Sequence, residues 1–159
     1  MALGSAFPPQ FLQAQIRRRL VPGAVIKLMV TMDDGELQEK RFVVIKVDDN
    51  TSTCVINSEI GPYIQARPHL ARCQASMPVA QHDFMDHDSF VDCSRARQYK
   101  TPDVLRDLQN EPTWILGAIS EDLRDQIVAG LKASTLIAPK DVSVLCACLD
   151  AIDYSQPPV

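Results

Sequence analysis

The residues best suited to acid–base chemistry lie in one stretch of the sequence. All three histidines, His69, His82 and His87, fall within or at the edge of the segment from Ser58 to Asp88. Imidazole titrates near neutrality, which makes it a natural general acid or base. His82 and His87 are each followed by an aspartate, and we predict that His82 is the better candidate. Solvated loop histidines without a chemical role are the alternative interpretation.

The five cysteines do not indicate a disulfide framework or a redox pair. Their number is odd, and the first residues lack the basic and apolar regions of a secretion signal. One residue separates Cys146 from Cys148, whereas a redox pair has two intervening residues. The atom types that bind tetrahedral zinc occur in Cys73, His82, His87 and Cys93. Because their spacing matches no compact zinc motif, we predict no metal and no other cofactor, and reduced thiols that pack as small apolar side chains.

Length and composition indicate one globular domain expected in the cytoplasm. The chain has 159 residues, 46% of them hydrophobic, and a formal net charge of −4. No apolar run approaches the roughly 20 residues that span a bilayer, so we expect no membrane partner. The acidic charge counts against a generic nucleic-acid binder but permits a local basic groove.

Basic and aromatic side chains could form such a groove for single-stranded RNA. Aromatic rings stack on bases while Lys and Arg bind phosphates. The basic candidates are Arg17 to Arg19, Lys40, Arg67, Arg72, Arg95, Arg97 and Lys100, with Tyr63 or Phe84 as stacking surfaces. A solvated basic face without RNA is the alternative.

Alternating apolar residues predict short strands. The predicted strands are Ala24 to Met32, Lys40 to Val47, Thr51 to Asn57, Ser89 to Cys93 and Trp114 to Ile119. Short turns join the first three, which predicts an antiparallel meander, because a parallel crossover needs a longer connection. In the second strand, Phe42 and Val44 share one face, and Val43, Ile45 and Val47 share the other. Both faces of this strand are therefore expected to be covered by other parts of the chain.

Helices are predicted at both ends and near the middle of the chain. Capping and periodicity signals place them at Gln10 to Leu20, Thr101 to Asn110, from Ser120 to about Lys132, and after Pro139. Thr101 and Ser120 are predicted as hydroxyl caps. Ser58 to Asp88 has no periodicity and is predicted to be a long functional loop. Short strands closed by helices predict a mainly β fold with α elements, built on a small half-open antiparallel barrel.

Several segments, taken in order, resemble the PemK/MazF family of bacterial toxins. The matching segments are Val21-Pro22-Gly23-Ala24-Val25-Ile26, Lys40-Arg41-Phe42-Val43-Val44-Ile45, Cys54-Val55-Ile56-Asn57-Ser58, Asp88-Ser89-Phe90-Val91-Asp92-Cys93, and Trp114 to Leu123. Two positions depart from the family pattern: Phe42 replaces a proline and Ser58 replaces a threonine. The resemblance implies an SH3-like barrel in a single domain, residues 1–159. Residues 1–20 would be a helical extension, 21–137 the barrel with its closing helix, and 138–159 a last helix and tail.

The resemblance also implies a function and its residues. Members are metal-independent endoribonucleases that cleave single-stranded RNA as homodimers and are inhibited by a cognate antitoxin. Arg41 would stabilise charge on the scissile phosphate, Ser58 would donate a hydrogen bond to it, and the RNA's 2′-hydroxyl would be the nucleophile. The alternative for Arg41 is a surface ion pair with Glu36 or Glu39. The alternative for the whole chain is a non-catalytic barrel module that binds a protein partner.

Overall fold

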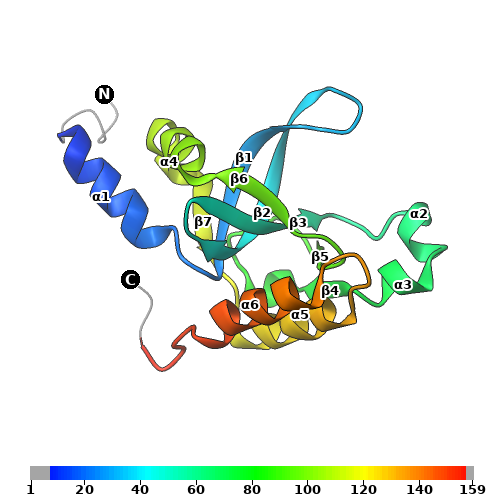
Figure 1. Ribbon diagram of the computed structural model, residues 1–159. Helices are drawn as coiled ribbons and strands as arrows, with labels where there is room; N and C mark the ends of the chain where they lie inside the picture. The colour runs from blue at the N-terminus through cyan, green and yellow to red at the C-terminus, as the bar shows by residue number, and fades with distance from the viewer. Residues whose placement is uncertain (1–7, 157–159) are drawn as a thin grey trace.

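One curled antiparallel sheet forms the centre of the protein, as a computed structural model of residues 8–156 describes it. Its seven strands are β1 (Ala24–Thr31), β2 (Leu37–Val47), β3 (Asn50–Asn57), β4 (Gln74–Met77), β5 (Ser89–Asp92), β6 (Arg97–Lys100) and β7 (Ile115–Ala118). The order across the sheet is β4-β5-β3-β2-β1-β7, and β6 also pairs with β3. With helices on both sides (Figure 1), this is a mixed α/β fold around a half-barrel. Parts of both predicted terminal segments, residues 1–7 and 157–159, lie outside the described residues.

Two strands share one edge of β3. Asn50 to Thr53 pair with β6, whereas Ile56 and Asn57 pair with β5. Because β5 and β6 take different halves of the same edge, the sheet splits and curls there. β6 itself was not predicted, since Arg97-Gln98-Tyr99-Lys100 shows no apolar alternation.

A bulge in β2 reverses the expected alternation near the end of that strand. Val44 lies opposite Thr53, but Lys46 lies opposite Ser52, so Ile45 has no partner in the register. A bulge inserts one extra residue and shifts every later side chain to the other face. Val47 therefore packs with the core of Phe42 and Val44. Its predicted place beside Ile45 was wrong.

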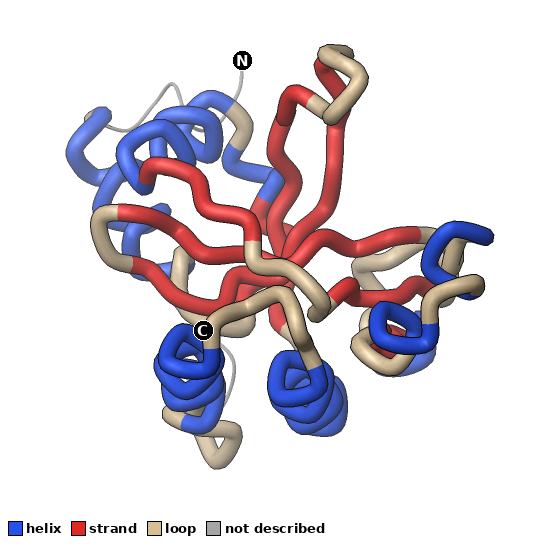
Figure 2. Tube along the Cα trace, turned by 45° about the vertical axis from the view of Figure 1, so that its right-hand side comes forward, coloured by secondary structure: helices blue, strands red, loops and turns tan. Residues whose placement is uncertain are grey.

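The first of two hydrophobic cores lies between the sheet and a pair of C-terminal helices. These are α5 (Glu121–Ala133) and α6 (Pro139–Asp150), which lie side by side beneath the strands (Figure 1, Figure 2). Val43, Ile45 and Cys54 face them from the sheet. Leu123, Ile127 and Leu131 are fully buried at helical spacing, as predicted.

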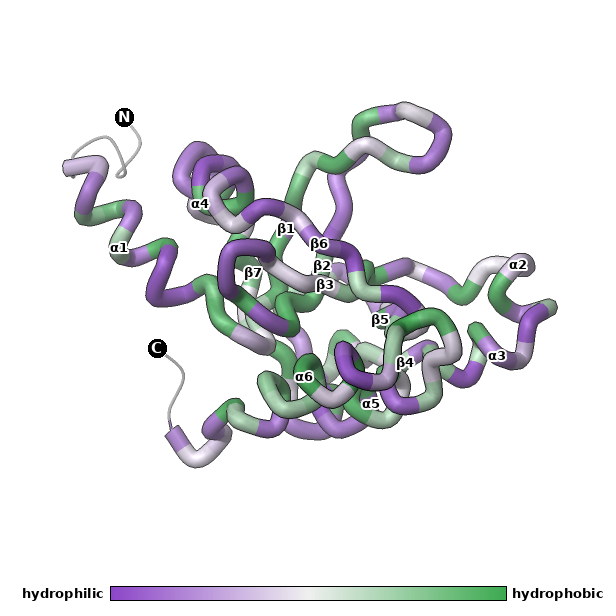
Figure 3. The backbone as a smooth tube through the Cα atoms, viewed as in Figure 1, coloured by the Kyte–Doolittle hydropathy of each residue, from purple (hydrophilic) through white to green (hydrophobic). Residues whose placement is uncertain are grey.

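The second core lies on the other face, under α1 (Pro9–Arg19) and α4 (Thr101–Asn110). Phe42 is fully buried there with Val44, Ile26 and Leu108. Ile16 of α1 is also buried, so α1 is packed into the domain and does not merely extend from it. Polar and apolar residues are mixed along these helices (Figure 3). Within residues 8–156, none of the helices has both the length and the apolar character needed to cross a bilayer.

The two predicted hydroxyl caps differ in the structure. Ser120 accepts a hydrogen bond from the backbone N–H of Leu123 at 3.1 Å and caps α5 as predicted. Thr101 is not a cap, because the N-cap position of α4 is Lys100. Its hydroxyl instead donates to the carbonyl of Asp48 at 2.6 Å, which ties α4 to the β2–β3 turn.

The long connection from β3 to β5 contains more structure than predicted. It includes the short helices α2 (Pro62–Gln65) and α3 (Pro68–Ala71), strand β4 and the 3-10 turn η2 (Val79–Gln81); a second such turn, η3 (Pro112–Trp114), precedes β7. β4 pairs with β5 from Gln74↔Asp92 to Met77↔Ser89. The connection therefore leaves the sheet, returns to it as an edge strand, and then runs back toward the end of β3.

Candidate functional site

Arg41 and Ser58, the two positions implied by the family resemblance, line one hollow beside the first half of β2 and the end of β3. We call it the Arg41 hollow; it has a volume of about 240 Å³. Its lining residues are Glu39, Lys40, Arg41, Ile56, Asn57, Ser58, Met85, Asp86, His87 and Ser89. Sheet register explains the juxtaposition. Arg41 lies opposite Ile56 near the end of β3, and Ser58 follows that strand directly.

The long connection supplies the other wall of this hollow. β5 pairs with the end of β3 through Asn57 and Phe90. Met85, Asp86 and His87, which lie just before β5, and Ser89, its first residue, are thereby placed in the wall of the same hollow as Arg41. No local pattern in the sequence indicates this arrangement, because it depends on a strand pairing between distant segments.

The guanidinium of Arg41 is held by the long connection. Its Nη2 lies 3.0 Å from Asp86 Oδ2, and its Nη1 lies 3.7 Å from the sulfur of buried Met85. The alternative partner Glu39 pairs instead with Lys27, at 3.1 Å. The alternative interpretation therefore named the wrong partner: Arg41 does form an ion pair, but with Asp86 and not with Glu36 or Glu39. The side chain keeps 23% of its surface exposed, so an anion entering the hollow can still reach it.

His87 also lines the hollow. Its Nδ1 lies 2.9 Å from the backbone carbonyl of Asp88. A carbonyl can only accept, so Nδ1 carries a proton, and in the neutral ring Nε2 keeps the lone pair. In the part of the chain that the structure describes, Nε2 has no hydrogen-bond partner. The hydroxyl of Ser89 lies 3.3 Å from Nδ1 and helps to hold the ring.

His82 is a structural residue, contrary to the prediction that it is the acid–base group. It is fully buried and is not among the residues that line the hollow. Its Nδ1 donates to the carbonyl of Pro78 at 2.9 Å, and its Nε2 accepts the backbone N–H of Ser120 at 3.0 Å. Both nitrogens are occupied and neither reaches solvent, so His82 cannot exchange a proton with a substrate. It fixes the long connection to the start of α5.

Lys40 and Tyr63, two predicted RNA-binding residues, lie in an adjoining hollow of about 430 Å³. The two hollows share Lys40, Ile56, Asn57 and Ser58. Tyr63 is 63% exposed. The guanidinium of Arg67 lies over its ring at 3.5 Å, and Arg67 Nη1 donates to the Tyr63 carbonyl at 2.8 Å. This contact makes a stacked tyrosine–arginine platform beside the Arg41 hollow.

Two other predicted RNA contacts lie elsewhere. Arg95 lines a separate groove that shares no residue with the Arg41 hollow. Phe84 is half-buried and packs against Gly117 of β7. A Cβ atom at Gly117 would lie 2.4 Å from the Phe84 ring. Phe84 therefore fixes the connection to the sheet and does not offer a stacking surface.

The cysteines lie in the core and do not form a site. All five are free thiols, and Cys54, Cys73, Cys93 and Cys146 are buried. Burial raises the pKa of Cys73 and of Cys146. A hydrogen bond with Cys54, together with burial, holds the pKa of Cys93 well above its usual range. Among residues 8–156, histidine, cysteine and acidic side chains form no group of three or more that could hold a metal ion.

The site thus combines a guanidinium, a free imidazole nitrogen, a hydroxyl and an aromatic platform. Of the predicted site residues, Arg41, Ser58, Lys40 and Tyr63 line these two adjoining hollows, and Arg67 stacks on Tyr63. His82 and Arg95 lie elsewhere, and Asp86 and Ser89, which also line the Arg41 hollow, were not predicted. No protein-family model and no curated protein matches the sequence of this chain.

Proposed function

We propose that the chain is an endoribonuclease that cleaves single-stranded RNA by attack of the RNA's own 2′-hydroxyl, and that it acts as the toxin of a type II toxin–antitoxin pair. One observation carries the proposal: Arg41, Ser58 and His87 line the same hollow. The half-barrel with its C-terminal helix pair is consistent with an SH3-like PemK/MazF barrel. The sequence segments that resemble that family give further support.

Arg41 would bind the scissile phosphate. A guanidinium can donate two parallel hydrogen bonds to phosphate oxygens and so stabilise the charge that develops on them. In the absence of RNA, the carboxylate of Asp86 pairs with this guanidinium. A phosphate oxygen of the substrate would take the place of that carboxylate. Exposed ion pairs contribute only about 0–1 kcal/mol. Asp86 is 76% exposed, so a polyanionic substrate could displace it. Ser58 would add a hydroxyl donor.

His87 would take the place predicted for His82. Its free Nε2 would accept the proton of the 2′-hydroxyl as the 2′-oxygen attacks phosphorus. The bond from phosphorus to the 5′-oxygen then breaks, and the products are a 2′,3′-cyclic phosphate and a 5′-hydroxyl. The leaving oxygen takes a proton from solvent, and the imidazolium returns its proton to solvent. Every atom of the step comes from the RNA, His87 and water.

The neighbouring hollow would hold the adjacent nucleotides. Lys40 would contact a backbone phosphate, and a base would stack on the Tyr63–Arg67 platform. Single strands suit this arrangement because their bases are free to stack on side chains. The family resemblance further supports a homodimer and a cognate antitoxin that blocks the hollow.

Cleavage of a labelled single-stranded RNA in the presence of EDTA tests this proposal. Wild type should produce fragments that end in 2′,3′-cyclic phosphate. Arg41→Ala should be slower by about 10²–10³-fold, as when one donor to a developing oxyanion is removed. Arg106→Ala is the matched control, since Arg106 is an exposed arginine on α4 that pairs with Asp103. Intact RNA with wild type, or equal cleavage by wild type and Arg41→Ala, would rule the proposal out.

A further inference from the structure

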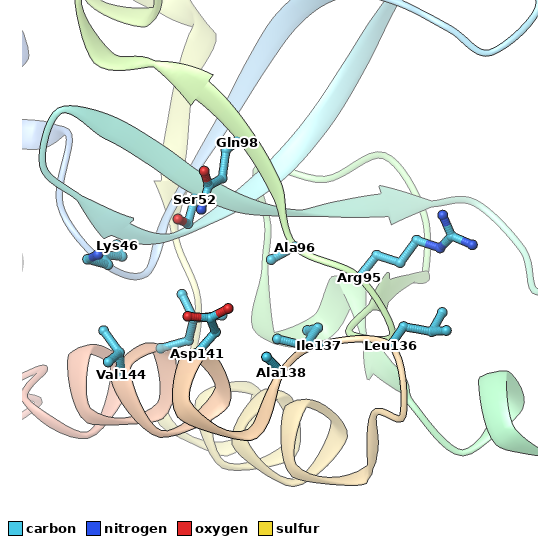
Figure 4. Close-up of a pocket in the computed structure, with 11 residues that line it drawn as sticks. Lys46, Ser52, Arg95, Ala96, Gln98, Leu136, Ile137, Ala138, Asp141 and Val144 are labelled. Atoms are coloured by element: carbon cyan, nitrogen blue, oxygen red, sulfur yellow. The ribbon is translucent and has the colours of Figure 1, made fainter.

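A second, larger groove lies between the sheet and the start of α6. Its volume is about 630 Å³, and it opens between β3, β6 and the segment that leads into α6 (Figure 4). It shares no lining residue with the Arg41 hollow. The groove is therefore independent of the proposed nuclease site.

The sheet side of the groove carries polar groups without partners. Ser52 is only 3% exposed, yet its hydroxyl makes no hydrogen bond to any of residues 8–156. Gln98 lies opposite Ser52 in the register and contributes a free side-chain amide. Both groups line the open groove, where they can hydrogen-bond to water or to a ligand.

The helix side of the groove is apolar. Leu136 and Val144 are 48% and 47% exposed, and both line the groove, together with Ile137. In Figure 4 these side chains lie on the side opposite Ser52 and Gln98. One wall thus offers hydrogen bonds and the other offers hydrophobic contact.

Charged residues mark the ends and the rim. Lys46 and Arg95 lie at opposite ends of the groove, and Asp141 projects from α6 toward the sheet (Figure 4). Lys46 is already paired with Asp48 at 2.7 Å. Arg95 is exposed and makes no ion pair within the described part of the chain. Its guanidinium therefore remains free for a carboxylate at that end of the groove.

We propose that this groove binds an extended segment of a partner polypeptide that carries an acidic side chain followed by apolar side chains. The carboxylate pairs with Arg95, the apolar side chains cover Leu136 and Val144, and backbone amides bond to Ser52 and Gln98. Asp141 accepts from a peptide N–H. RNA fits less well, because no lining residue is aromatic and Asp141 repels phosphate. The inference does not depend on the proposed nuclease activity.

Selection from a phage-displayed library of random linear peptides tests the proposal. We expect selected peptides to share an aspartate or glutamate next to leucine, isoleucine or valine. A synthetic consensus peptide should bind Arg95→Glu and Val144→Glu at least about tenfold more weakly than wild type, because each change removes a contact that the proposal assigns to the peptide. Arg18→Glu, an exposed charge reversal on α1, is the matched control and should bind as wild type does. Thermal unfolding checks that each variant is folded.

Ser52→Ala separates binding from folding. Removing a hydroxyl that makes no hydrogen bond within residues 8–156 should leave the melting temperature unchanged while weakening peptide binding. The absence of an acidic–apolar consensus, or equal binding by Arg95→Glu and wild type, would overturn the proposal. So would an RNA oligonucleotide that shifts the backbone NMR signals of Gln98 and Val144. Self-association lost in Val144→Glu would identify a second copy of the chain as the occupant and would also overturn it.

Discussion

Arg41 of β2 and Asp86 of the β3–β5 connection form an ion pair, with Nη2 and Oδ2 3.0 Å apart. The two residues are 45 positions apart in sequence, and β5 pairing with the end of β3 brings them together. Met85 packs beneath the same guanidinium. The connection therefore positions the arginine and also supplies an internal anion that competes with any anionic ligand.

Asp86→Asn should strengthen RNA binding. The substitution removes the competing charge, and an exposed pair is worth about 0–1 kcal/mol, so affinity should rise by up to about fivefold. The free energy of unfolding should change by less than about 1 kcal/mol. Fluorescence anisotropy with a short single-stranded RNA measures the affinity in a cleavage-deficient His87→Ala background. Asp83→Asn, an exposed aspartate on the same connection, is the control. Weaker binding by Asp86→Asn would mean that Asp86 supports the site.

His82→Ala and His87→Ala should have opposite effects on folding and activity. His82→Ala removes two buried hydrogen bonds and leaves a cavity, so the free energy of unfolding should fall by about 2–4 kcal/mol. His87 is exposed, so His87→Ala should change stability by less than about 0.5 kcal/mol. It should slow RNA cleavage by about 10²-fold or more. Urea titration and the cleavage assay measure both effects, with His69→Ala as the control. A fully active His87→Ala would contradict its assignment as the base.

Gly117→Ala should loosen the attachment of the long connection. The new methyl group would lie 2.4 and 2.5 Å from two Phe84 ring carbons. The ring cannot move freely, because it packs edge-on against buried His82. We expect the free energy of unfolding to fall by about 1–3 kcal/mol. Phe84→Leu in the same chain should restore part of the loss, because it removes the clashing ring atoms. Gly61→Ala, where nothing lies within 4 Å of the added Cβ, should be nearly neutral.

Alkylation should distinguish Cys148 from the other cysteines. Cys148 is half-buried, and the other four are buried. Raised pKa values leave Cys73, Cys93 and Cys146 with less thiolate at neutral pH, and the thiolate is the reactive form. Intact mass after iodoacetamide treatment should show one fast addition, which Cys148→Ser removes. The slow thiols should react faster as the pH rises toward their pKa values or after unfolding. Fast labelling of Cys93 in the folded protein would contradict this account.

The sequence was informative wherever the signal is local. Alternation predicted β1, β2 and β3 to within a few residues, because the side chains of a strand point to opposite faces in turn. The apolar spacing of α5 and its Ser120 cap were recognisable because helix periodicity and capping involve neighbouring residues. β6 was missed, because its four residues are held by pairing with β3 and carry no apolar pattern of their own.

Sequence patterns alone were enough to predict the strand meander, the four longer helices and a sheet covered on both faces, and the family resemblance pointed to Arg41 and Ser58 as candidates. Only the tertiary structure shows that Ile45 bulges, that His82 is buried while His87 lines the Arg41 hollow, and that Arg95 lies on a different groove. The physical reason is that burial and charge pairing depend on which distant segments meet. Which distant segments come into contact depends on strand pairing and packing across the whole chain, so no short stretch of residues can predict these contacts.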